Sequence, residues 1–189
     1  MPRGMHLRLS ADEVAPLLAA IDGSDAVVEA VTALEEQPAV FARGCETDKA
    51  WDPIACALAP EGADSPWPAR GIIGGARDLL DDEEVGWVTH SDPAESAEIA
   101  AFLAFLADET FRSAYNDMPD DLRNPEYGDD ELEYALANLH DLRDFFAATS
   151  AAGEHVLPVT THDLGRGAGC RQPAELLSAG GYGAALTDR

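Results

Sequence analysis

One short segment places together side chains that could meet a ligand. Lys49 is the only lysine of the chain; it follows Asp48, and Trp51 stands two residues further on. A cation and an aromatic ring at the rim of a pocket could receive an anionic or planar ligand. The same residues could instead be an ion-paired surface lysine and a tryptophan of the core. The segment is therefore a candidate binding site with a structural alternative.

Histidines and nucleophiles do not form a recognisable constellation. His155 and His162 are seven residues apart, and no H-E-x-x-H or G-x-S-x-G motif occurs. His140 could pair with Asp144 one turn further along an expected helix. Because 36 residues are acidic, two neighbouring carboxylates say little about acid–base catalysis. The sequence predicts no catalytic residue, no metal and no cofactor.

Two adjacent glycines form a second candidate site. Gly74 and Gly75 follow Ile72 and Ile73, a pattern that predicts a strand ending in a tight turn. The pair could approach a phosphate, but it lacks the lysine and hydroxyl of a P-loop and the spacing of a dinucleotide fingerprint. The turn is the favoured interpretation.

Charge and cysteine content limit the classes of function. The formal net charge is −24, which repels nucleic-acid phosphates and anionic membranes. Nor does any apolar run have the length of a membrane span. The three cysteines are odd in number and share no CxxC spacing, which is typical of reduced thiols in the cytoplasm. The first six residues also lack the apolar core of a signal peptide. The acidic surface is either a solubility coat or an attraction for a basic partner, including mimicry of a nucleic acid.

Hydrophobic periodicity predicts an α+β fold with a single compact domain. Asp92 followed by Pro93 and Glu95 is the clearest helix start. Asp52 before Pro53 indicates another. The segment around Tyr115 is expected to form turns. Helices are expected near residues 12–21, 25–36, 48–58, 92–106 and 130–148, and strands or extended segments near 6–9, 39–44, 72–73, 86–90 and 155–160. We therefore expect short strands packed with about five helices over residues 4–162, followed by a flexible Gly/Ala-rich tail over 163–189.

The order of these segments resembles the bacterial YfbM-like family, a domain of unknown function. The resemblance covers about residues 4 to 160, and Asp48-Lys49-Ala50-Trp51 is its most specific part. Other shared parts are the N-terminal strand and capped helix, Ile73-Gly74-Gly75, residues 86–106, Tyr115, the long helix and the closing strand. The family has a histidine and a glycine after the tryptophan, where this chain has Asp52 and Pro53. The resemblance implies a bacterial, cytoplasmic α+β domain and supplies no reaction.

Together these observations favour a non-catalytic acidic module that binds a protein or a small ligand in the cytoplasm. The candidate binding residues are Asp48, Lys49, Trp51, Gly74 and Gly75. Neither direct nucleic-acid binding nor a membrane is expected. The alternative is a small hydrolase or transferase whose pocket lies near Asp48, Lys49 and Trp51, so enzymatic activity stays open.

Overall fold

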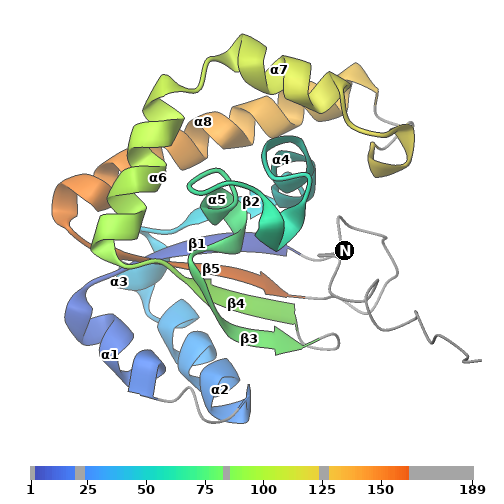
Figure 1. The fold of residues 1–189 in the computed structure, drawn as a ribbon. Coiled ribbons are helices and arrows are strands. Elements are labelled where there is room, and N and C mark those ends of the chain that lie inside the picture. The colour runs from blue at the N-terminus through green and yellow to red at the C-terminus, as the bar shows by residue number, and fades with distance from the viewer. Residues whose placement is uncertain (1–2, 20–23, 83–85, 124–127, 162–189) are drawn as a thin grey trace, which may run out of the picture.

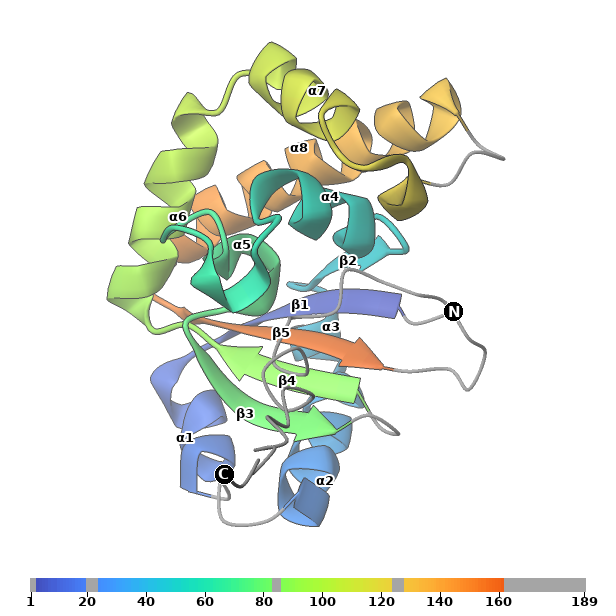
Figure 2. The same cartoon turned by 45° about the vertical axis from the view of Figure 1, so that its right-hand side comes forward.

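A five-stranded antiparallel sheet forms the centre of the molecule, with helices on both faces (Figures 1 and 2). The computed structural model describes residues 3–19, 24–82, 86–123 and 128–161. The strands are β1 (Arg3–Leu9), β2 (Cys45–Asp48), β3 (Arg77–Asp82), β4 (Gly86–His90) and β5 (His155–Thr161), in the spatial order β2-β1-β5-β4-β3. The predicted α+β single domain is confirmed.

The first and last described strands pair at the centre of the sheet. Arg3 of β1 lies opposite Thr161 of β5, and the register continues without a shift to Leu9 and His155. Alternation along β1 sends Leu7 and Leu9 to one face and His6 to the other. This pairing closes the fold between segments about 150 residues apart in sequence.

Five helices cover one face of the sheet, here called the α8 face (Figure 1). They are α4 (Trp51–Leu58), α5 (Gly71–Gly74), α6 (Pro93–Phe105), α7 (Asp108–Asn116) and α8 (Asp129–Ala152). Their apolar side chains share one core that includes Ile54, Ile99, Phe111, Leu139 and Phe146. The short 3-10 helices Gly62–Asp64 and Asp120–Leu122 lie in the connections.

Three helices, α1 (Ala11–Ala19), α2 (Ser24–Glu35) and α3 (Pro38–Phe41), cover the opposite face of the sheet (Figure 2). A second core forms there between these helices and the strands, with Leu7, Leu9, Leu17, Val27 and Leu157 among its members. The two cores give the molecule three layers, which is a common solution for burying both faces of a sheet.

Local sequence signals fix several helix ends as expected. Ser10 and Glu13 exchange hydrogen bonds at the start of α1, a capping box. Asp92 and Glu95 do the same at the start of α6. Gly153 ends α8 in the left-handed conformation with φ 65°. The start of α6 at Asp92 was predicted from residue type and spacing, whereas the first helix was expected to begin nearer residue 12 and begins at Ala11.

All five expected helices are present, but three further helices correct the prediction. Helix α3 takes up the first part of residues 39–44, which were expected to be extended. Helix α5 includes residues 72–73, which were expected to form a strand, and Tyr115, expected in turns, lies in α7. Asp52 is not a helix cap, because α4 already begins at Trp51 with Ala50 as its N-cap. Strands β2 and β3 were not predicted. The expected tail over 163–189 lies outside the described residues.

Candidate functional site

The candidate segment Asp48–Trp51 is a tight turn between β2 and α4. The amide of Ala50 donates to the carbonyl of Thr47 at 2.8 Å. Asp48 has φ 43°, a left-handed conformation that non-glycine residues adopt rarely and aspartate more readily than most. Lys49 is exposed at the turn. The chain thus reverses within a few residues, from an edge strand to a helix.

Trp51 is a core side chain at the start of α4. Its side chain is 6% exposed and meets Trp87 edge to face, with ring centroids 4.9 Å apart. It also lies against the backbone of β1 at Gly4. A Cβ at Gly4 would stand 2.9 Å from the Trp51 Cβ and 2.5 Å from the Thr47 Oγ1. The turn and the tryptophan therefore pack directly onto the sheet, where only a glycine leaves room.

Asp48 joins the same turn to the long helix α8. The Tyr134 hydroxyl donates to an Asp48 carboxylate oxygen at 3.1 Å, and Arg3 lies 3.6 Å from the other oxygen. Burial, followed by the hydrogen bond to Asp48, raises the pKa of Tyr134. These contacts give Asp48 and Trp51 structural roles. A binding role for Asp48, Lys49 and Trp51 stays a prediction.

Gly74 and Gly75 belong to the end of α5. Gly75 is the C-cap, with φ 61°, and its Cα faces Thr89 so closely that a Cβ would stand 2.5 Å from the Thr89 Oγ1. Gly74 has open space where its Cβ would be. The pair therefore ends a helical turn and packs against β4, and a ligand role for it stays a prediction.

A histidine pair lies where β4 ends and β5 begins. His90 Nε2 and His155 Nδ1 are 3.0 Å apart, so the N–H of one ring donates a hydrogen bond to the nitrogen of the other. Burial, together with the charges of Arg77 and His155, lowers the pKa of His90 to about 4. Arg77 in turn contacts Asp92 and Glu95 at the start of α6. Burial also lowers the pKa of His155. At neutral pH the pair is therefore uncharged, and it joins β4 to β5.

The remaining candidates from the sequence have structural partners. His140 contacts Asp108 of α7 at 3.0 Å rather than the predicted Asp144. Cys45 and Cys56 are buried, and neither forms a disulfide within the described residues. Burial, followed by the charge of Asp141, raises the pKa of the Cys45 thiol to about 12. That thiol is therefore protonated at neutral pH and a poor nucleophile.

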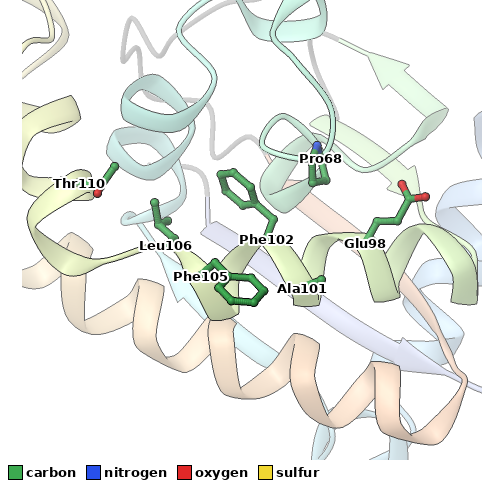
Figure 3. A pocket seen from close by; sticks show the side chains of 7 residues that line it. All are labelled: Pro68, Glu98, Ala101, Phe102, Phe105, Leu106 and Thr110. Carbon is green, nitrogen blue, oxygen red and sulfur yellow. The ribbon is translucent and has the colours of Figure 1, made fainter.

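An apolar hollow on α6 is the surface feature that sequence reasoning missed. It has a volume of about 520 Å³, and its lining comes from the loop before α5, from α6 and from the start of α7 (Figure 3). The lining residues are Pro68, Glu98, Ala101, Phe102, Phe105, Leu106 and Thr110. In Figure 3 the Phe102 ring points toward the loop that carries Pro68, and Phe105 lies beside Ala101.

Phe105 dominates this surface because the residue is 90% exposed. It falls outside the buried stripe of α6, in which Ile99 and Leu103 are fully buried. A signal was therefore present in the sequence, since a phenylalanine off the apolar stripe of an amphipathic helix points toward solvent. A large exposed aromatic ring beside a hollow is typical of an interaction site.

The walls of this hollow are held by contacts on both sides. The Trp67 indole N–H donates to Glu98 of α6, and Arg70 stacks over the Trp67 ring at 5.4 Å. On the other side, Arg143 of α8 donates to the carbonyls of Leu103 and Leu106 at 3.0 and 2.8 Å. These bonds tie α8 to the C-terminal end of α6. The hollow is thus a preformed feature of the fold.

A second, polar hollow of about 510 Å³ lies between α8 and the β1–β2 edge. Its arginines are already paired: Arg8 with Glu154 at 2.5 Å, and Arg43 with Glu13 at 2.7 Å. Within the described ranges, no group of three or more histidine, cysteine or acidic side chains is arranged to hold a metal ion. No described helix combines the length and apolar character needed to cross a membrane.

Comparison with known proteins gives a family but no activity. Residues 3–159 match the family described as Domain of unknown function (DUF1877). The fold is similar to the crystal structure of a protein of unknown function, YfbM from Escherichia coli. The TM-score is 0.62 at 18% identity, covering 84% of this chain and 99% of that one. A comparison with curated proteins finds no match.

Proposed function

The chain belongs to the DUF1877 family of domains of unknown function, and we propose that it is a non-catalytic acidic module that binds a basic protein partner. We take the module as residues 4–162 and place it in the cytoplasm of a bacterium. The binding surface is the apolar hollow on α6, centred on Phe105.

The exposed Phe105 carries this proposal. Fully burying a phenylalanine side chain contributes roughly 1.5–3 kcal/mol, and 90% of this one is exposed. Phe102, Leu106 and Pro68 line the same hollow, so a partner that covers Phe105 would also meet these apolar side chains. Aromatic side chains next to well-formed pockets often dominate the energetics of protein interfaces.

Charge supports a basic partner over the other occupants. A second copy of this chain would bring another formal charge of −24 to the interface, and long-range repulsion would slow and weaken that encounter. A nucleic acid would be repelled for the same reason. A basic protein is attracted instead, with Glu98 in the hollow and the exposed Glu109 next to Thr110 as local acids.

Site-specific photo-crosslinking in bacterial cells tests the proposal. A photoreactive phenylalanine analogue replaces Phe105 in one full-length protein and Phe41 in a control. Phe41 is 55% exposed and lies on α3, which covers the opposite face of the sheet. We expect a discrete adduct with a basic protein from position 105 only, which weakens as salt is raised. Absence of an adduct, or the same adduct from both positions, would contradict the proposal.

A further inference from the structure

The face of α6 that lines the hollow has the spacing of a helix-packing surface. Glu98, Ala101, Phe102 and Phe105 stand at positions i, i+3, i+4 and i+7, so they follow one another along a single side of the helix. Helices that pack on each other use such ridges and the grooves between them. Three of the four residues are apolar, and none is fully covered by the rest of the described chain.

The dimensions of this face suit a short helix. From Glu98 to Phe105 the helix axis rises about 10 Å, or two turns, at 1.5 Å per residue. Pro68 borders the face on one side, and Leu106 and Thr110 close its far end. Ala101 is small and exposed, so a partner backbone can approach closely between Glu98 and Phe105. An extended strand would instead need free backbone groups to pair with, and the backbone of α6 is already hydrogen-bonded within the helix.

We infer that the partner docks as an amphipathic basic helix laid along α6, an inference that rests on the proposed function. Its apolar side chains, spaced at i, i+3, i+4 and i+7, fill the hollow around Phe105 and Phe102. Its lysines or arginines flank that stripe and meet Glu98 and Glu109. The charge of the chain, −24, draws the basic helix in, and the apolar stripe sets its register.

Designed peptides test the helix separately from the natural partner. The first peptide is a 16-residue amphipathic helix with leucines at i, i+3, i+4 and i+7 and lysines on the remaining face. The second has the same composition in an order without an apolar face, and the third is the first with one central proline. Fluorescence anisotropy measures binding to the full-length protein, to Phe105→Ser and to Phe41→Ser, at about 50 and 300 mM salt.

We expect the first peptide to bind the unaltered protein about tenfold more tightly than either of the others. Phe105→Ser should remove that advantage, and Phe41→Ser should keep it. Equal affinity for all three peptides would mean that charge alone attracts them, and it would refute docking as an amphipathic helix. If Phe105→Ser still binds the first peptide more tightly than the other two by the same factor, the hollow around Phe105 is not the binding surface.

Different results would refute the binding of a basic partner and its docking as a helix. A natural partner captured from position 105, with no preference among the peptides, would keep the proposed function and refute the helix. A crosslink from position 105 to residues 163–189 of the same chain, or to a second copy, would make those the occupants and refute both. Circular dichroism and thermal unfolding of Phe105→Ser should match the unaltered protein, because an exposed side chain contributes little to the core.

Discussion

The buried histidine on β1 should make the stability of this protein fall steeply in mild acid. His6 is 1% exposed, lies edge-on to Phe145 and Phe146, and its Nε2 donates to the carbonyl of Ile72 at 2.9 Å. Burial lowers the pKa of His6 from 6.5 to about 4, although the bond to Ile72 acts in the opposite direction. The folded protein therefore holds this ring neutral at pH 5.

The direction and size of the effect follow from proton binding. At pH 5 the unfolded chain has protonated His6 and the folded protein has not, so lowering the pH favours unfolding. The pKa values of 6.5 and about 4 give a loss of about 2 kcal/mol between pH 7 and pH 5, and about 3 kcal/mol once the pH falls below both values. The stabilisation is fully present only above the unfolded pKa of 6.5.

A matched variant isolates this contribution from the titrating carboxylates. His6→Gln keeps an N–H donor for the carbonyl of Ile72 and cannot be protonated in this range. It should be less stable than the unaltered protein at pH 7, and that difference should narrow by about 2 kcal/mol at pH 5. Urea unfolding followed by the fluorescence of the three tryptophans measures both free energies at each pH.

A second variant controls for general destabilisation. Ile99→Val removes a methyl group from a fully buried position and should cost about 1 kcal/mol at both pH values. Its stability curve should stay parallel to that of the unaltered protein. If the free energy of unfolding of His6→Gln also differs from that of the unaltered protein by the same amount at both pH values, the prediction is refuted. His6 would then have the same proton affinity in the folded and unfolded states.

Three further substitutions test the contacts that position the elements, each by urea unfolding at neutral pH. Gly4→Ala should lower the free energy of unfolding by about 1–3 kcal/mol, because its Cβ would meet Thr47 and Trp51. Gly74→Ala has open space around it and should leave that free energy unchanged or raise it slightly. Equal effects of the two substitutions would contradict the prediction. Asp92→Ala should cost about 1 kcal/mol through loss of the capping box of α6, and no loss would show that α6 does not depend on its cap. Tyr134→Phe should cost about 1 kcal/mol by removing the bond to Asp48, and an unchanged stability would mean that water replaces the hydroxyl fully.

Those parts of the fold that depend on local chemistry could be predicted from the sequence. The start of α6 follows from Asp92, Pro93 and Glu95, each favourable at its own position. The end of α8 follows from Gly153, which adopts the left-handed conformation at little cost. In both places the neighbouring residues decide the backbone, so no knowledge of the tertiary structure is needed.

The parts that depend on distant contacts could not be predicted. Strand β3 contains Asp78, Asp81 and Asp82, which are poor strand formers by propensity. Among the described strands it lies at the edge of the sheet and pairs with β4 alone. Charged side chains at such an edge also discourage pairing with other chains. Helix α5 has only four residues, and its Ile72 carbonyl is held by His6 from β1. A pair of β-branched residues before two glycines gives no local sign of that contact.

The candidate binding surface, like β3 and α5, was not predicted from the local sequence. In the most specific segment of the sequence, Asp48–Trp51, the unusual residues have structural contacts. Asp48 accepts a hydrogen bond from Tyr134, and Trp51 packs on Trp87. Acidic side chains are too common in this chain for any one of them to mark a site. Phe105 is informative for the opposite reason, because an aromatic ring that is 90% exposed beside an apolar hollow gains nothing from the fold that surrounds it. The free energy available from covering that ring is therefore still open to a partner, and we propose that the charge of −24 favours a basic one.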